Sequence, residues 1–242
     1  MRLEAHDISK SFGSSRVLDG LAISLEGGEM VCLLGRNGAG KTTLLRVLSG
    51  LLRPSAGEMR LDGEILDFAD DHNRQAVGLV MHQPYLYEHL TGLENLRFYS
   101  RLYQTGLEQK ELVSHLSRVG LGKSGQKPVR GYSRGMKQRL TLARALLHDP
   151  KILLLDEPYT GLDLSGSQLL NKLLLEEQEQ GRLILATTHE LTYAHQIAKR
   201  FDLLSRGKIA ESIQNEDLPL QELEAWVARF LDSQPSKKAV PV

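Results

Sequence analysis

The sequence has 242 residues, of which 41% are hydrophobic and 25% charged, a balance typical of a globular protein and not of a disordered chain. Its 30 basic and 30 acidic side chains cancel, so composition gives no reason to expect nucleic acid as a partner. The single cysteine, Cys32, excludes an internal disulfide and argues against a zinc cluster.

The chain lacks the apolar segments that membranes require. No stretch approaches the roughly 18 to 20 apolar residues of a membrane-spanning helix. Residues 1–7 lack the hydrophobic segment of a secretion signal. We therefore expect a soluble, cytoplasmic protein, for which any membrane association requires a partner.

The first elements of the chain predict strands of two kinds. Residues 1–28 and 57–65 resemble half-exposed strands with turns at Gly13 and at Asp62–Gly63, and they predict an antiparallel β-subdomain. Met30–Leu34 is short and wholly apolar, so it predicts a strand buried on both faces, with Cys32 packed inside as a small hydrophobe.

Alternation of helix and strand then predicts an α/β fold with a parallel sheet. Residues 41–52 predict a helix that ends near Pro54. Three more short apolar runs, each followed by polar residues, predict buried parallel strands at 77–81, 152–155 and 183–187.

The middle of the sequence, residues 91–147, shows no convincing strand. Thr91 and Glu94 form the pattern of a capping box ahead of apolar residues at helical spacing. A second apolar stripe follows at residues 112–119, and a third helix is predicted at 133–147. We interpret residues 85–148 as an all-helical subdomain inserted in the α/β core.

The C-terminal part predicts two further helices. One covers residues 164–180, with Gly181 as its cap. The other has an apolar face between Leu220 and Leu231, which favours packing on the core, although a partner-binding helix is the alternative. Residues 1–232 are thus expected to form one domain, followed by a flexible tail at 233–242.

A glycine-rich segment between the strand at 30–34 and the helix at 41–52 fits the P-loop pattern G-x-x-x-x-G-K-[ST]. Glycines let successive backbone N–H groups point at phosphate oxygens, Lys41 supplies a positive charge, and Thr42 offers a hydroxyl to Mg²⁺. A glycine-rich connector without a ligand is the alternative. The predicted nucleotide-binding residues are Gly35, Asn37, Gly38, Ala39, Gly40, Lys41, Thr42 and Thr43.

Two acids end the apolar run at residues 152–155. In P-loop proteins such a strand lies beside the strand that carries the loop, so Asp156 is predicted to hold Mg²⁺. Glu157 is then placed to orient and deprotonate the attacking water. Two exposed acids at an ordinary strand end are the alternative.

Two more polar residues follow predicted strands at the same edge of the sheet. His189 comes after the strand at 183–187 and is a candidate for the γ-phosphate, although a lone histidine there can be structural. Gln83 comes after the strand at 77–81 and is a candidate for Mg²⁺ or the attacking water. The predicted catalytic residues are therefore Glu157, His189 and Gln83, and the predicted metal ligands are Thr42, Gln83 and Asp156.

With three further motifs, the sequence resembles the ABC ATPase family over residues 1–215. Residues 132–139 (Tyr-Ser-Arg-Gly-Met-Lys-Gln-Arg) are similar to the family's signature sequence, and residues 158–163 (Pro-Tyr-Thr-Gly-Leu-Asp) are similar to its D-loop. Phe12 stands where the family places an aromatic ring that stacks on adenine, although by itself it would be interpreted as a core residue.

The resemblance implies a P-loop ATPase that uses ATP and Mg²⁺ and works as a head-to-tail pair of cassettes. Each ATP would contact Lys41 and Thr42 of one cassette and Ser133 and Gly135 of the other, and Asp163 joins the expected nucleotide-binding set. ATP-driven closure would power export through a separate integral membrane subunit. The second cassette would be identical or closely related, and the chain would lie peripherally on the inner face of the cell membrane.

The signature departs from the common Leu-Ser-Gly-Gly-Gln at three positions, where Tyr132, Arg134 and Met136 stand. Ser133 and Gly135, the residues expected to contact phosphate, remain. The amino-acid sequence of the signature, residues 132–139, resembles that of exporter-type cassettes. Residues 91–99 and 156–163 are similar to the haem-export cassette of cytochrome c maturation.

Two other functions stay open. One is a soluble single-cassette ABC ATPase in an assembly complex. The other is a nucleotide-binding module without catalysis, which the loss of catalytic groups would favour. Every such group is present: Lys41, Gln83, Asp156, Glu157 and His189.

Overall fold

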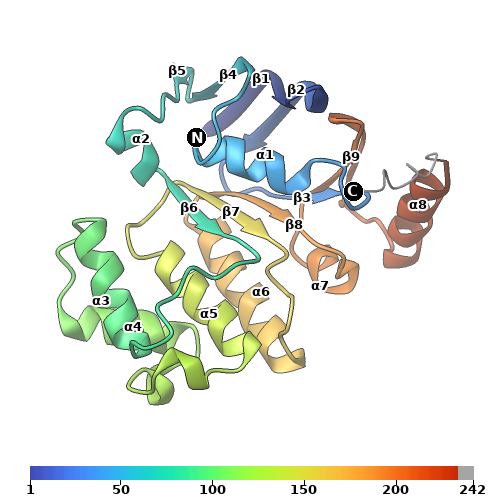
Figure 1. Cartoon of the computed structure of the whole chain (residues 1–242). Coiled ribbons are helices and arrows are strands. Elements are labelled where there is room, and N and C mark those ends of the chain that lie inside the picture. Colours follow the sequence, from blue (N-terminus) through green and yellow to red (C-terminus); the bar gives the residue numbers. More distant parts are fainter. Residues whose placement is uncertain (234–242) are drawn as a thin grey trace.

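The structure is a computed structural model that describes residues 1–233, except for the side chains of Asp71 and His72. It contains two sheets with helix α1 between them and further helices on the far face of the larger sheet (Figure 1). The smaller sheet is antiparallel, in the order β2-β1-β4-β5. Its strands are β1 (Arg2–Phe12), β2 (Ser15–Glu26), β4 (Ala56–Leu61) and β5 (Glu64–Ile65).

The larger sheet has the order β10-β9-β3-β8-β7-β6, with β10 antiparallel to β9 and the other neighbours parallel. Its strands are β3 (Met30–Leu34), β6 (Val77–Val80), β7 (Ile152–Asp156), β8 (Leu183–Thr187), β9 (Arg200–Ser205) and β10 (Lys208–Gln214). The antiparallel subdomain, the parallel sheet and the strands expected near 30, 77, 152 and 183 are confirmed.

Strand β3 is wholly apolar because its two faces pack against two different hydrophobic cores. Met30, Cys32 and Leu34 face the core that includes α5 and α6, whereas Val31 and Leu33 face the core around α1. All five side chains are buried because the parallel strand is covered on both faces. Cys32 is a buried strand residue, as its place in the run predicted.

Helix α1 (Lys41–Leu48) ends earlier than the predicted residue 52. Gly50 adopts a left-handed φ of 72°, and a Cβ at this position would lie 2.3 Å from the Phe68 ring. The chain therefore leaves the helical path at a site that only glycine fits.

Between β6 and β7 the chain forms only helices apart from one isolated bridge, Thr91–Pro128. The predicted capping box of α3 is present: Thr91 Oγ1 accepts from the Glu94 N–H at 3.1 Å, and Glu94 Oε2 accepts from the Thr91 N–H at 2.8 Å. The helices are α3 (Gly92–Leu102), α4 (Gln109–Arg118) and α5 (Arg134–Ala145), with short 3₁₀ turns at Gly122–Ser124 and Val129–Gly131.

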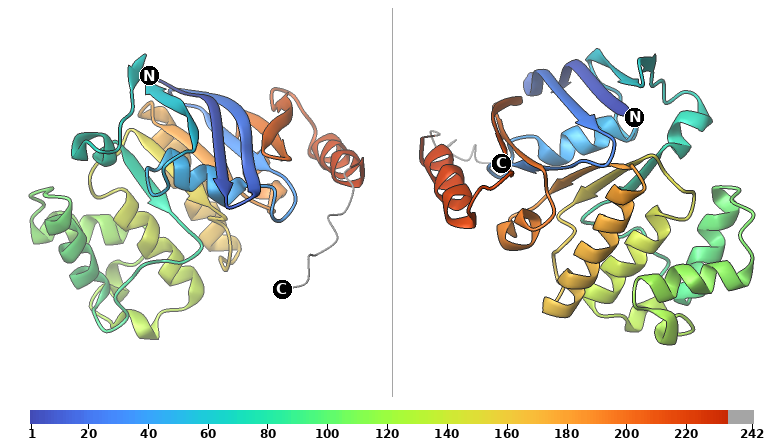
Figure 2. Two further views of the ribbon diagram at one scale, coloured as in Figure 1. Left: turned by 45° about the horizontal axis from the view of Figure 1, so that its top comes forward. Right: turned by 180° about the vertical axis from the view of Figure 1, so that it is seen from behind.

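Of four further helices, two were predicted and two were not. The expected helix at 164–180 is α6 (Leu164–Glu179), and Gly181 beyond its end has a left-handed φ of 81°. Helix α8 (Leu220–Ser233) buries Leu223 and Phe230 against the core, as its apolar face predicted. Figure 2 shows this helix, in red, at the periphery of the molecule. Short helices α2 (Asp71–Gln75) and α7 (Leu191–His195) were missed. The predicted tail lies, from residue 234 onward, outside the described residues.

Strands β9 and β10 were also missed. Charged residues interrupt β9, but Arg200 pairs with Asp202 at 3.0 Å and with Glu29 at 3.1 Å. The pairing lets two charged side chains enter a buried strand.

Candidate functional site

The glycine-rich loop leaves the carboxyl end of β3 and enters α1. Gly35, Gly38 and Gly40 all have positive φ, and a Cβ at Gly35 would lie 2.5 Å from the Leu204 carbonyl oxygen. Gly40 caps α1 without any side-chain acceptor for the first N–H groups of the helix. Open N–H groups at the start of a helix suit a phosphate.

Lys41 lies against this loop with a side chain that is 8% exposed. Its Nζ donates to the Gly35 carbonyl at 2.6 Å and lies 3.4 Å from the Arg36 carbonyl. Burial lowers the pKa of Lys41, and the nearby carboxylates of Glu157 and Asp156 oppose that shift. The ammonium thus already sits over the loop, held by carbonyls that a phosphate would replace.

Asp156, at the end of β7, meets the P-loop helix through a hydroxyl. Thr42 Oγ1 lies 3.0 Å from Asp156 Oδ2 and 3.3 Å from Oδ1. The carboxylate is 4% exposed, so the alternative of an exposed acid at a strand end is wrong for Asp156. The expectation that its strand adjoins β3 is also wrong, because β8 lies between β3 and β7.

Glu157 follows in a left-handed conformation with φ of 53°, which is uncommon for a residue with a side chain. Its carboxylate accepts from the His189 N–H at 3.2 Å and lies 3.3 Å from His189 Nε2. The His189 side chain is 60% exposed, so this histidine is not a core residue. The two predicted catalytic residues therefore meet at the open edge of the sheet.

Gln83 lies apart from these groups. It is exposed in the loop after β6, and no hydrogen bond within residues 1–233 joins it to the other candidates. The loop itself is fixed, because buried Arg144 donates to the carbonyls of Leu79 and Pro84 at 3.0 Å each. Tyr99 also donates to the Tyr85 carbonyl.

The signature residues begin α5. Ser133 is its N-cap and accepts from the Met136 N–H at 3.2 Å, but its side chain stays exposed. A Cβ at Gly135 would lie 2.8 Å from the Gly161 carbonyl oxygen, so the helix packs closely on the D-loop. Among the described residues, no hydrogen bond or ion pair connects Ser133 or Gly135 with the P-loop of the same chain.

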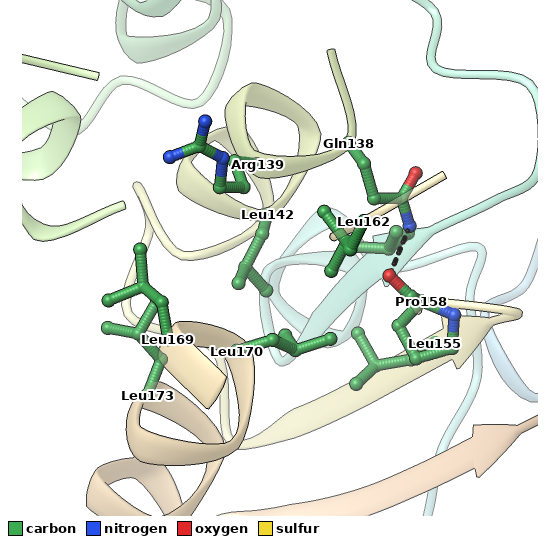
Figure 3. A pocket seen from close by; sticks show the side chains of 10 residues that line it. Gln138, Arg139, Leu142, Leu155, Pro158, Leu162, Leu169, Leu170 and Leu173 are labelled. Carbon is green, nitrogen blue, oxygen red and sulfur yellow. Dashed lines mark hydrogen bonds between the residues drawn. The ribbon is translucent and has the colours of Figure 1, made fainter. Parts of the chain in front are cut away.

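Figure 3 shows a second contact between α5 and the D-loop, in which Gln138 Nε2 donates to the Pro158 carbonyl at 3.1 Å. The leucine-lined cavity beside it measures about 10 Å³, room for at most one water molecule. This cavity therefore does not hold a nucleotide.

Phe12 and Asp163 complete the predicted set. Phe12, at the end of β1, is 51% exposed, with Lys10 Nζ 5.4 Å from its ring centroid, so the interpretation as a core residue is wrong. Asp163 caps α6 by accepting from the Gly166 N–H at 2.7 Å, and this bond lowers the pKa of its carboxyl group. It lies exposed at the surface.

Comparison with known proteins assigns this arrangement to a family. The profile described as "ABC transporter" matches residues 18–160. The chain belongs to the ABC transporter family.

Two relatives and one solved structure give the similarity in numbers. The chain is 34% identical over 234 residues to the bacitracin transport ATP-binding protein BcrA of Bacillus licheniformis, covering 96% of this chain and 74% of that protein. It is 36% identical over 213 residues to the SkfA peptide export ATP-binding protein SkfE of Bacillus subtilis, covering 87% and 88%. A dimeric ATP-binding cassette in a post-hydrolysis state with ADP and Pi matches with a TM-score of 0.78 and 26% identity, covering 89% of this chain and all of that one.

These similarities fix the fold and the general activity. The chain has the fold of a P-loop ABC cassette, and it is an ATPase that serves as the ATP-binding subunit of a transporter. Among residues 1–233, no helix is both long and apolar enough to cross a bilayer.

Proposed function

We propose that this cassette hydrolyses ATP at two shared sites, between itself and a second cassette, and that closure of the pair drives export through a separate membrane subunit. The observation that carries the proposal is the cluster of Lys41, Thr42, Asp156 and Glu157 at one edge of the parallel sheet. Both carboxylates lie close enough to Lys41 to oppose the lowering of its pKa.

Within the cluster, each residue has a separate task. Lys41 would exchange its carbonyl partners for the β- and γ-phosphates, since a charged acceptor binds an ammonium more strongly than a peptide oxygen. Glu157 would orient the attacking water and accept its proton, and the adjacent His189 would hold the Glu157 side chain and contact the γ-phosphate. Gln83 would contribute its amide to the attacking water from the loop after β6.

The donor set also fits Mg²⁺. Thr42 Oγ1 and the Asp156 carboxylate present oxygen ligands 3.0 Å apart beside the P-loop, and Mg²⁺ prefers such ligands. When bound, the ion would neutralise charge on the transferred phosphate. Gln83, from the loop after β6, would supply a further oxygen ligand.

Pairing of cassettes is supported by the exposure of the signature residues. Ser133 and Arg134 at the start of α5 are exposed, and within residues 1–233 no hydrogen bond joins Ser133 to the P-loop. A helix N-terminus of this kind would complete the site of an opposing copy. The similar dimeric cassette with ADP and Pi provides a precedent for such a pair.

The surface for the membrane subunit is proposed to lie on α3 and the loop before it. Tyr85, Tyr87 and Phe98 are exposed there, and the rings of Tyr87 and Phe98 are 4.7 Å apart. Aromatic groups on a shallow surface suit an apolar helix or loop from a partner. The cassette would thereby be peripheral on the inner face of the membrane.

The cargo is inferred from the relatives. One is named for bacitracin transport and another for SkfA peptide export, so we favour a peptide-like export substrate over haem. An assembly-complex ATPase is the competing function. Co-purification of the intact chain with an integral membrane protein, lost when Tyr87 and Phe98 are both changed to Ser, is the result that favours the transporter.

The central test of this function is Glu157→Gln, which keeps the shape of the side chain but removes the base. We expect ATP to bind and hydrolysis to fall at least about a hundredfold, so that light scattering finds an ATP-bound dimer. Glu179→Gln, on the surface end of α6, is the matched control and should behave as the unmodified protein. A protein that stays monomeric with saturating ATP would contradict the paired mechanism.

A further inference from the structure

Thr187 is the last residue of β8, the strand that lies between the two strands leading into the candidate site. Strand β8 lies between β3, which leads into the P-loop, and β7, which ends in Asp156. In register, Thr187 is opposite Leu33 on one side and Asp156 on the other. Its side chain is 0% exposed. The last residue of β8 therefore sits between the two parts of the candidate site.

The Thr187 hydroxyl forms bonds to both acidic positions. It donates to Asp156 Oδ1 at 2.8 Å and accepts from the Glu157 N–H at 3.1 Å. The other oxygen of Asp156 is 3.0 Å from Thr42 Oγ1. The carboxylate is thus held by the Thr187 hydroxyl on Oδ1 and by the Thr42 hydroxyl, which is nearer to Oδ2, and the two contacts fix the orientation of its plane.

The same hydroxyl also supports the unusual backbone of Glu157. The Glu157 N–H donates to the Thr187 carbonyl at 3.1 Å as well as to the hydroxyl. A left-handed backbone is strained for a non-glycine residue and needs support from its surroundings. This conformation directs the Glu157 side chain to His189.

We infer that Thr187 is a positioning residue for hydrolysis. Its hydroxyl orients the Asp156 carboxylate toward the Mg²⁺ position and holds the backbone from which Glu157 reaches the water. The inference rests on the proposed roles of Asp156 and Glu157. It assigns to β8 a direct part in the chemistry, beyond its place as a buried strand in the sheet.

The experiment compares three variants at this position. Thr187→Val keeps the branched shape and removes the hydroxyl, Thr187→Ala removes both, and Thr187→Ser keeps the hydroxyl. Thr141→Val is the matched control, because Thr141 is also 0% exposed, but its hydroxyl donates to the Lys137 carbonyl at 2.9 Å, lies 3.5 Å from the Pro84 carbonyl and makes no hydrogen bond to Asp156 or Glu157 within the described residues. The measurements are kcat, the affinity for ADP without metal, the affinity of the ADP-bound protein for Mg²⁺ by calorimetry, and Tm.

A hydrogen bond to a charged group corresponds to a factor of about ten to a hundred. We expect kcat and Mg²⁺ affinity of Thr187→Val and Thr187→Ala to fall about tenfold or more on this basis, with ADP affinity in the absence of metal unchanged. Thr187→Ser should restore both quantities, and Thr141→Val should change neither. A purely structural role would lower Tm without separating Mg²⁺ affinity from ADP affinity.

Wild-type kcat and Mg²⁺ affinity in Thr187→Val or Thr187→Ala would overturn the inference, as would a serine variant no better than the valine variant. If neither the valine nor the alanine variant folds, the serine variant decides alone, since a loss of Mg²⁺ affinity in a folded Thr187→Ser protein contradicts a hydroxyl role. Glu157→Gln measured in parallel separates the two claims. Active Glu157→Gln protein refutes the proposed function, whereas inactive Glu157→Gln with normal Thr187→Val refutes only the role of Thr187.

Discussion

The two halves of the candidate site differ in how the chain supports them. At the end of the parallel sheet, Lys41, Asp156 and Thr187 are at most 8% exposed and bonded to one another or to the P-loop. At the start of α5, Ser133 and Arg134 are exposed, Ser133 caps its own helix, and Arg134 lies against Gly161 of the D-loop. The residues of the first half are buried and bonded within the chain, whereas those of the second half are exposed.

The contrast follows from where each half lies. Strand ends are surrounded by the packed sheet, so their polar groups must find partners inside the chain. A helix N-terminus at the surface has water for its N–H groups and can exchange it for a phosphate. If the proposed function holds, folding of one chain forms the half at the sheet end, whereas the signature residues stay exposed for an opposing cassette.

An ion-pair cluster that connects helix α4 with helix α6 and with Arg182, just before β8, gives the largest expected effect. Glu177 of α6 is 0% exposed, lies 2.7 Å from Arg118 of α4 and also pairs with Arg182. Glu177→Ala should cost about 3 kcal/mol of unfolding free energy, because it leaves two arginines without their buried partner. Urea denaturation provides the measurement.

The matched control is Glu176→Ala, which removes a 37% exposed partner of the same Arg118. Its cost should stay below about 1 kcal/mol, as for other surface ion pairs. Equal losses in the two variants would show that the helical region is not joined to the sheet through the buried pair.

The pH dependence of ADP binding tests the role of Lys41 in the half of the site at the end of the parallel sheet. Because burial lowers its pKa below the ordinary 10.5, the free protein loses this proton at a lower pH than an exposed lysine does. Bound phosphate stabilises the ammonium and raises the pKa, so ADP affinity should fall as pH rises through the lowered pKa. Titration with fluorescent ADP from neutral to alkaline pH measures the decline.

In the same titration, Lys41→Met should bind ADP about ten- to a hundredfold more weakly at neutral pH, the worth of a hydrogen bond to a charged group. Its affinity should also lose the alkaline decline. A decline of the same size in the methionine variant would assign the titration to another group.

Phe12 gives the smallest effect. Its exposed ring at the end of β1 is available for stacking, and stacking of a base on an aromatic ring contributes about 1 kcal/mol or more. Phe12→Ala should therefore weaken ATP binding about fivefold or more, whereas Phe12→Tyr should keep the affinity. Equal ATP affinity in all three proteins would remove Phe12 from the nucleotide site.

Sequence patterns predicted the parts of the fold that rest on local chemistry. Unbroken apolar runs located β3, β7 and β8, and the capping-box pattern at Thr91 located α3. The pattern of the P-loop placed Lys41 and Thr42 correctly at the start of a helix.

Features that depend on distant partners were not predictable in the same way. Strand β9 was not predicted because it contains the charged residues Arg200 and Asp202, and the ion pair between them is known only from the structure. The strand order, in which β8 lies between β3 and β7, cannot be predicted from the local sequence. Thr187 was therefore missed as a site residue, although it is a polar residue at the end of an apolar strand. The end of α1 was missed because the contact of Gly50 with Phe68 is not visible in the local sequence.

A mixing experiment tests most directly whether the two halves act in different chains. Lys41→Met disables the half of the site at the end of the parallel sheet, and Ser133→Arg disables the half at the start of α5. Each protein alone should therefore be inactive. In a mixed dimer, one site combines an intact P-loop with an intact signature helix, and the mixture should regain ATP hydrolysis. Wild-type hydrolysis by Ser133→Arg alone, or no recovery in a mixture shown to contain mixed dimers, would contradict the account.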